Sequence, residues 1–136
     1  MIINDVPMEC INLAAMQYHV PAVIIVSVLK AEGGRIGNAN GNKNGTVDYG
    51  PMQINSVWLD VLKKHGYSSY DLQYNPCLNV AAGTWILAQG IAEDRSIWKG
   101  IGNYHSHSYV ENLTYQYKVN VFTRLLEVAI SRANAY

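Results

Sequence analysis

Apolar residues recur at helical spacing through the first third of the chain. Ile11, Ala14 and Tyr18 lie on one face of residues 9–18, which predicts a helix there. A second helix is predicted over residues 21–32, ending at the pair Gly33-Gly34. Residues 22–29 are apolar on nearly every side of that second helix, and such a helix is a buried one.

The same periodicity continues in the second half of the chain. Helices are predicted from Asn55 or Ser56 to about residue 64, from about 76 to 92, from 97 to 101 and from about 113 to 131. The first of them is expected to turn four side chains inward: Val57, Trp58, Val61 and Leu62. The last carries four side chains on one stripe: Tyr117, Val121, Leu125 and Val128.

Residues 37–50 interrupt this helical pattern. The segment holds four Gly and four Asn in fourteen residues, and both residue types favour turns. We therefore expect a loop or tight hairpin here, within a small β region at about residues 40–54. The predicted fold class is α+β, mainly helical, with no large sheet.

Composition narrows the classes of function. The 136 residues fit one domain, predicted as residues 1–136, and 49% of them are hydrophobic. Ten basic and ten acidic side chains cancel, which makes nucleic acid an unexpected partner. No apolar segment is long enough to predict a membrane span. Ten Tyr and three Trp against one Phe favour polar, ring-shaped ligands such as sugars.

Glu32 is the most informative acidic residue. It closes the most hydrophobic helix, where apolar walls and the negative end of the helix dipole both disfavour a charged carboxylate. A raised pKa would suit a general acid at neutral pH. The alternative is an exposed glutamate at a frayed helix end.

Two further features follow within 25 residues of Glu32. Asp48 lies 48 − 32 = 16 positions later and is the second carboxylate of a glycoside-cleaving pair, a turn residue bonded to its own backbone, or both. If residues 52–55 are extended, Gln53 and Asn55 share one face and present amides to a cleft, while Met52 and Ile54 face the core.

Other chemistries find no support in the motifs. Residues 40–45 resemble the opening of a calcium loop, but the position of the twelfth ligand is Pro51. His105 and His107 lack a third ligand motif, so no metal site and no cofactor are predicted. Cys10 and Cys77 are 67 positions apart and are either buried thiols or, in an exported protein, one disulfide.

Read in order, several segments resemble the lytic transglycosylases of the lysozyme-like superfamily, in particular the small secreted members that accompany secretion systems, conjugation machinery and type IV pili. The resemblance runs from Cys10 to about Val121. It rests on residues 10–18, 20–21, 32–33, 44–55, 58–59, 75–80, 83–88, 104–106 and 117–119. One departure is Asn103-Tyr104-His105-Ser106, where many larger relatives have Ala-Tyr-Asn-x-Gly.

The resemblance implies a lysozyme-like fold and cleavage of peptidoglycan glycan strands with Glu32 as the catalytic acid/base. It places four side chains around the muramyl sugar or the catalytic carboxyl: Gln53, Asn55, Tyr104 and Tyr117. It also implies a periplasmic mature form whose signal peptide is absent, a Cys10–Cys77 disulfide, and secretion-system or pilus assembly proteins as partners. Asp48 remains open as a second carboxylate of a lysozyme-type hydrolase or a stabiliser of the sugar cation, and a non-catalytic wall-binding role is the third alternative.

Overall fold

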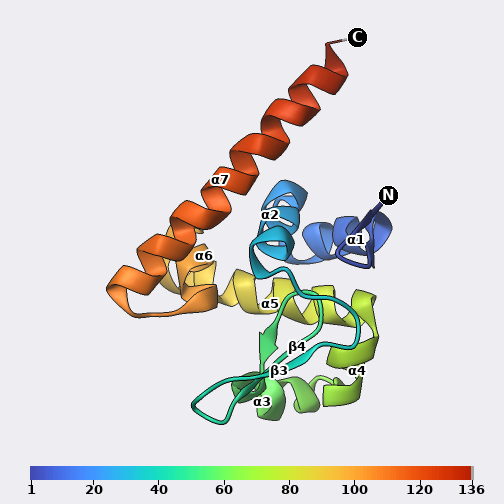
Figure 1. Ribbon diagram of the computed structural model, residues 1–136, viewed down its shortest axis with the longest axis vertical. Coiled ribbons are helices and arrows are strands. Elements are labelled where there is room, and N and C mark those ends of the chain that lie inside the picture. The colour runs from blue at the N-terminus through green and yellow to red at the C-terminus, as the bar shows by residue number, and fades with distance from the viewer. Residues whose placement is uncertain (136) are drawn as a thin grey trace.

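Helices make up most of the structure, a computed structural model that describes residues 1–135 (Figure 1). The α-helices are α1 (Met8–Tyr18), α2 (Ala22–Glu32), α3 (Leu59–Lys64), α4 (Ser69–Tyr74), α5 (Pro76–Asp94), α6 (Ile97–His105) and α7 (Tyr109–Asn134). A 3-10 helix, η1 (Ser56–Trp58), precedes α3. The strands are β1 (Ile2–Ile3), β2 (Val6–Pro7), β3 (Ala39–Gly41), β4 (Val47–Tyr49) and β5 (Ile54–Asn55). The mainly helical α+β class is therefore confirmed.

The predicted apolar helix is α2, and it lies in the core. Every residue from Ile24 to Leu29 is buried, including Ser27, whose hydroxyl donates to the carbonyl of Val23 at 2.7 Å. Gly33 ends the helix in a left-handed conformation, with φ of 67°, and its N–H donates to the Leu29 carbonyl. A residue with a Cβ adopts that φ at a cost, which explains why glycine ends this helix.

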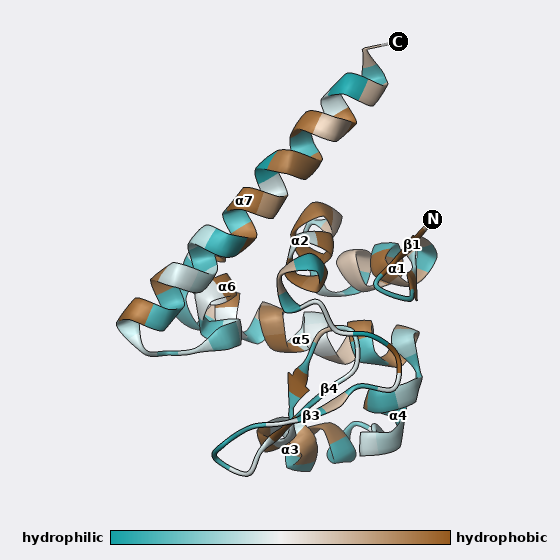
Figure 2. Cartoon of the chain, in the orientation of Figure 1, coloured by the Kyte–Doolittle hydropathy of each residue, from teal (hydrophilic) through white to brown (hydrophobic). Residues whose placement is uncertain are grey.

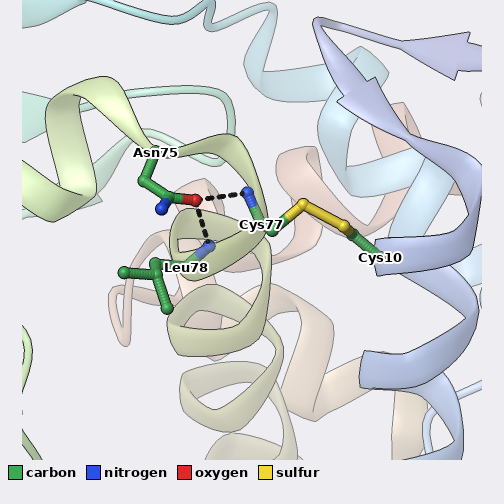
Figure 3. Close-up of a disulfide and its surroundings, with 4 residues drawn as sticks. All are labelled: Cys10, Asn75, Cys77 and Leu78. Atoms are coloured by element: carbon green, nitrogen blue, oxygen red, sulfur yellow. Dashed lines mark hydrogen bonds between the residues drawn. A yellow bond between two sulfur atoms is a disulfide. The ribbon is translucent and has the colours of Figure 1, made fainter.

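Helix α5 lies at the centre of the fold, where it packs against α1, α4 and α6 (Figure 1). Its first turn is held by Asn75, whose side-chain oxygen accepts from the N–H groups of Cys77 and Leu78 (Figure 3). Pro76 occupies the first helical position, where a missing N–H costs nothing.

A disulfide ties α1 to the start of α5 (Figure 3). Cys10 and Cys77 are bonded with their Cα atoms 5.4 Å apart, which confirms the pairing that the family resemblance implied. Disulfides persist in oxidising compartments, so this bridge indicates a location outside the cytoplasm. Among the helices of residues 1–135, none has the length and apolar character needed to cross a membrane.

Three antiparallel strands form the sheet β3-β4-β5, within the predicted β region. Its register sets Asp48 of β4 between Asn40 of β3 and Asn55 of β5. Asn55 also caps η1, because its side-chain oxygen accepts from the N–H of Val57 at 3.0 Å. The predicted helix start at Asn55 is thus confirmed, although its first turn is 3-10.

The prediction that Val57 and Val61 point inward is wrong. Val57 is 68% exposed and Val61 38% exposed, while Leu62 is buried. The reason is that η1 winds with three residues per turn and α3 with 3.6, so one helical projection does not describe both.

Two short elements have no counterpart in the predictions. Helix α4 rests on a capping box between Ser68 and Asp71 and buries Leu72. The β1–β2 hairpin turns through Asn4 and Asp5, both with positive φ. Elements of two to six residues carry too few apolar positions for periodicity to detect them.

Helix α7 packs on α6 and α2 through one face and then extends past the rest of the molecule (Figure 1). Its buried residues include Tyr115, Val119 and Thr123, and the Thr123 hydroxyl donates to Ser27 at 2.8 Å. The predicted stripe of Tyr117, Val121, Leu125 and Val128 is exposed. The periodicity located the helix correctly, but the packed face is the opposite one.

Candidate active site

A cleft of about 690 Å³ lies at the C-terminal end of α2. Its walls come from α2, the β3–β5 sheet, η1, α5, α6 and the start of α7. Side chains that line it include Glu32, Asn42, Asp48, Gln53, Asn55, Trp58, Ile86, Tyr104, His105 and Glu111. The structure therefore brings together five of the six predicted catalytic and binding residues, and leaves out Tyr117.

Glu32 is the last residue of α2, and its side chain lines the cleft beside a close contact between Gly34 and the turn at Gly50. A Cβ at Gly34 would lie 2.1 Å from the carbonyl oxygen of Gly50 and 2.8 Å from the side-chain nitrogen of Gln53. Because Gly34 has no side chain, the chain after Glu32 packs directly on the turn between β4 and β5. This contact sets the carboxyl opposite the sheet.

Tyr115 holds the Glu32 carboxyl from α7. Its hydroxyl donates to Oε2 of Glu32 at 2.5 Å. Burial raises the pKa of Glu32 to about 7; the Tyr115 hydrogen bond and the positive charge of Lys118 lower it, and the charge of Asp48 raises it. Burial together with Glu32 raises the pKa of Tyr115 well above its usual range, so this phenol stays a donor. Glu32 is thus protonated in a substantial fraction of molecules at neutral pH.

Asp48 is fixed in the cleft by neutral amides. Asn55 Nδ2 donates to Oδ1 of Asp48 at 3.0 Å, and Asn42 Nδ2 donates to Oδ2 at 3.1 Å. Both amides also donate to the Thr46 hydroxyl. Each carboxylate oxygen therefore has its own donor, which orients Asp48 within the same cleft as Glu32. The expected bond from Asp48 to its own backbone is not found among the described residues, where the partners of its carboxylate are the two amides.

Gln53 and its neighbours divide between cleft and core as predicted. Met52 and Ile54 are buried and Gln53 and Asn55 line the cleft, although Ile54 also borders the cleft from below the surface. The backbone differs from a simple strand, because Gln53 has a φ of 53° and β5 begins only at Ile54. The Gln53 amide is held at both ends, since its nitrogen donates to the Gly50 carbonyl and its oxygen accepts from Asn40.

Tyr104 supports this segment from α6. Its hydroxyl donates to the carbonyl oxygen of Met52 at 2.7 Å. Burial and the nearby Glu32 raise the pKa of Tyr104 well above the usual range of a phenol. The hydroxyl is already engaged, so in this structure Tyr104 fixes the backbone beside Gln53 and presents its ring to the cleft.

Tyr117 lies elsewhere, and Tyr115 takes the place expected for it. Two residues turn a helix by about 200°, so Tyr117 points away from Tyr115 and is 74% exposed. Tyr115 was not among the predicted site residues, although the spacing of Tyr115, Val119 and Thr123 marks a second face of the same helix. His105 packs beside Tyr115 with the ring centres 4.8 Å apart.

The arrangement suits proton transfer to and from a neutral, hydroxyl-rich ligand. A carboxyl with a pKa of about 7 can both give and take a proton near neutral pH. Fixed amides on the opposite wall match hydroxyl and acetamido groups, and Trp58 offers an aromatic surface. Within residues 1–135, no three His, Cys, Asp or Glu side chains gather in a group that could hold a metal ion.

Comparison with known proteins gives one family and several relatives. A family model described as "Transglycosylase SLT domain" matches residues 9–109. A "Peptidoglycan-binding-like protein" of Escherichia coli O157:H7 is 32% identical over 139 residues, which cover 93% of this chain and 83% of that protein. "Protein IpgF" of Shigella flexneri is 28% identical over 124 residues, covering 89% and 82%. "Invasion protein IagB" of Salmonella typhimurium strain SL1344 is 30% identical over 105 residues, covering 76% and 66%.

Proposed function

Since the chain belongs to the transglycosylase SLT family, we propose that it cleaves the β-1,4 bond between N-acetylmuramic acid and N-acetylglucosamine in peptidoglycan. The observation that carries this proposal is Glu32, a carboxyl with a pKa of about 7 in a cleft lined by amides. The name of the relative described as peptidoglycan-binding-like supports the same substrate.

The proposed reaction needs one group that first gives and then takes a proton. Protonated Glu32 donates to the bridging oxygen, the bond from C1 to that oxygen breaks, and the electron pair leaves with the N-acetylglucosamine hydroxyl. The acetamido group of the muramyl sugar stabilises the cation at C1. The Glu32 carboxylate then removes the proton of the muramyl six-hydroxyl, whose oxygen bonds to C1. The product carries a 1,6-anhydro end, and Glu32 is protonated again.

The position of Glu32 supports both proton transfers. Its Oε2 accepts the Tyr115 hydrogen bond, so the carboxyl is held in one orientation while the other oxygen remains available. Desolvation keeps the proton on the acid before reaction, and Tyr115 with Lys118 limits how far the pKa rises. A carboxyl near neutral pKa loses and regains its proton with little free-energy difference.

The test is the mass of muropeptides that purified protein releases from sacculi. We expect fragments lighter by one water than hydrolysis products, and no release by Glu32→Gln, which keeps the shape of the side chain without its acidity. Undiminished release by Glu32→Gln would overturn the assignment of Glu32. Release of hydrated, reducing ends alone would overturn the anhydro product.

A lysozyme-type hydrolase is the second candidate, favoured by the position of Asp48. Asp48 lines the same cleft, each of its oxygens is held by an amide, and its charge raises the pKa of Glu32. In retaining glycosidases a second carboxylate stabilises or attacks the sugar cation. Asp48→Asn should slow bond cleavage by about a hundredfold to a thousandfold if Asp48 serves in either mechanism; a wild-type rate would exclude it from both.

A wall-binding component without turnover is the third possibility, and the same assay separates it. Protein that sediments with sacculi but releases no fragments would support binding alone.

For the active enzyme we further propose a single domain that works in the periplasm and opens the wall locally for a secretion or pilus machine. The disulfide supports the oxidising compartment, and the relative named as an invasion protein fits such a setting.

A further inference from the structure

Helix α7 is apolar on two opposite faces. One face, which includes Tyr115 and Val119, is buried against the body. The other carries six residues at spacings of three or four, here called the outer stripe: Val110, Leu113, Tyr117, Val121, Leu125 and Val128. All six are exposed, with exposed fractions from 40% to 74%, so nothing within residues 1–135 covers them.

The outer stripe is long, and its two ends face the same way. Its six residues span 18 positions in five steps, an average of 3.6, which matches the α-helical repeat, and Leu113 and Leu125 lie about 60° to either side of its centre line. At 1.5 Å per residue it is roughly 27 Å long. Apolar segments recur along much of α7, whose C-terminal part extends beyond the other helices (Figures 1 and 2). Contiguous exposed apolar surface of this kind marks an interaction site.

The spacing of the stripe reads the same in both directions. Val110 and Val128 lie nine positions either side of Val119, Leu113 and Leu125 lie six, and Tyr117 and Val121 lie two. Two copies related by a two-fold axis beside Val119 would therefore set Val110 on the partner's Val128 and Tyr117 beside the partner's Val121, while Leu113 and Leu125 flank these pairs on opposite sides. An interface between identical surfaces requires this self-complementarity.

We propose that the outer stripe binds the outer stripe of a second copy of this chain, with the two α7 helices antiparallel. Each body packs on the face of its own α7 opposite to the stripe, so the two bodies lie on the far sides of the pair and do not collide. This inference is independent of the proposed function, because none of the six residues of the outer stripe lines the cleft.

The area fits such a pair, and one like-charge contact weakens it. Lys118 and Lys118 of the partner subunit fall on the same side of the antiparallel pair, about two residues apart along its axis. The two stripes together would bury on the order of 1,000 Å², the lower bound expected of a specific interface. The association should accordingly be moderate and depend on concentration.

Sedimentation velocity over a range of protein concentrations tests the proposal. Wild-type protein should shift from monomer to dimer with rising concentration. Val110→Glu and Val128→Lys each place a charge against a valine at two symmetric positions, and each should weaken association about a hundredfold. Because both positions are exposed in one copy, each variant should keep the helical circular dichroism and unfolding midpoint of the wild type.

Mixing the two variants tests the antiparallel register itself. One pair in the mixed dimer joins the glutamate of Val110→Glu to the lysine of Val128→Lys, and the other joins two valines, so an equimolar mixture should dimerise although neither variant does alone. Leu13→Glu, at a leucine of α1 whose exposed fraction lies between those of Val110 and Val128, is the matched control and should dimerise like the wild type. A wild type that stays monomeric at every concentration, a dimer unchanged by Val128→Lys, or a mixture that stays monomeric would overturn the proposal.

Discussion

Replacing Glu32 by Gln should change how the stability of the protein depends on pH. In the folded chain the pKa of Glu32 is about 7, against 4.5 in a solvated chain. The difference corresponds to about 3 kcal/mol of unfolding free energy, because one pKa unit is worth about 1.4 kcal/mol. Gln keeps the shape of the side chain and an oxygen for the Tyr115 hydroxyl, but it has no proton to lose.

The sign follows from where the proton is held. The fold binds the Glu32 proton more tightly than the unfolded chain does, so wild-type stability is fully present below pH 4.5 and falls as the pH rises through 7. Glu32→Gln lacks this loss. The two proteins should be similarly stable near pH 4.5, and the variant should be more stable by about 3 kcal/mol near pH 8.5.

Urea denaturation with the disulfide intact, at several pH values from 4.5 to 8.5, measures this difference. Subtracting the two unfolding free energies at each pH removes the contributions of groups that both proteins share. Glu127→Gln makes the same chemical change at an exposed position of α7 and should follow the wild type. If the wild type and Glu32→Gln instead gave parallel curves, the carboxyl would not be destabilised by burial, and the argument for a proton donor at neutral pH would fail.

Two further predictions concern the bridge and the tyrosine of the site. Replacing Cys10 and Cys77 by Ser should lower the unfolding free energy by about 4 kcal/mol in the chain-entropy estimate, with less effect on turnover. The urea midpoint measures the first effect and the activity at saturating substrate measures the second. An unchanged urea midpoint would contradict this prediction. Tyr115→Phe removes the hydrogen bond that lowers the pKa of Glu32. The basic limb of the pH–rate profile should therefore move to higher pH, whereas Tyr117→Phe, at an exposed position, should leave it in place; the reverse pattern would return the role to Tyr117.

The sequence alone identified the elements that local physics controls. Residues 22–29 are almost all apolar, so a helix formed by them has to be buried. Glycine favours the left-handed conformation that ends a helix, so Gly33 marked the helix end. The position of Glu32 at the end of a buried helix could therefore be predicted from the sequence. The alternation of Met52, Gln53, Ile54 and Asn55 likewise placed both amides in the cleft and both apolar side chains among the buried residues before any contact was known. Within the site, then, sequence was sufficient for residues next to a strong local signal.

Short elements were beyond this reasoning. The six residues of α4 depend on one capping box, and β1 and β2 have two residues each. Segments of two or six residues are too short to show a hydrophobic periodicity. Both α4 and the β1–β2 hairpin exist because the core supplies a surface for Leu72 and Val6.

Only the tertiary structure decided which face of α7 enters the site. The helix has two apolar faces, and its own pattern makes Tyr117 as good a candidate as Tyr115. The body resolves the choice, because Ser27 on α2 pairs with Thr123 and the Glu32 carboxyl accepts the Tyr115 hydroxyl, and both partners lie on the same face of α7. Residues more than 80 positions apart make these contacts, and hydrophobic periodicity, which reports only neighbours along one helix, contains no information about them.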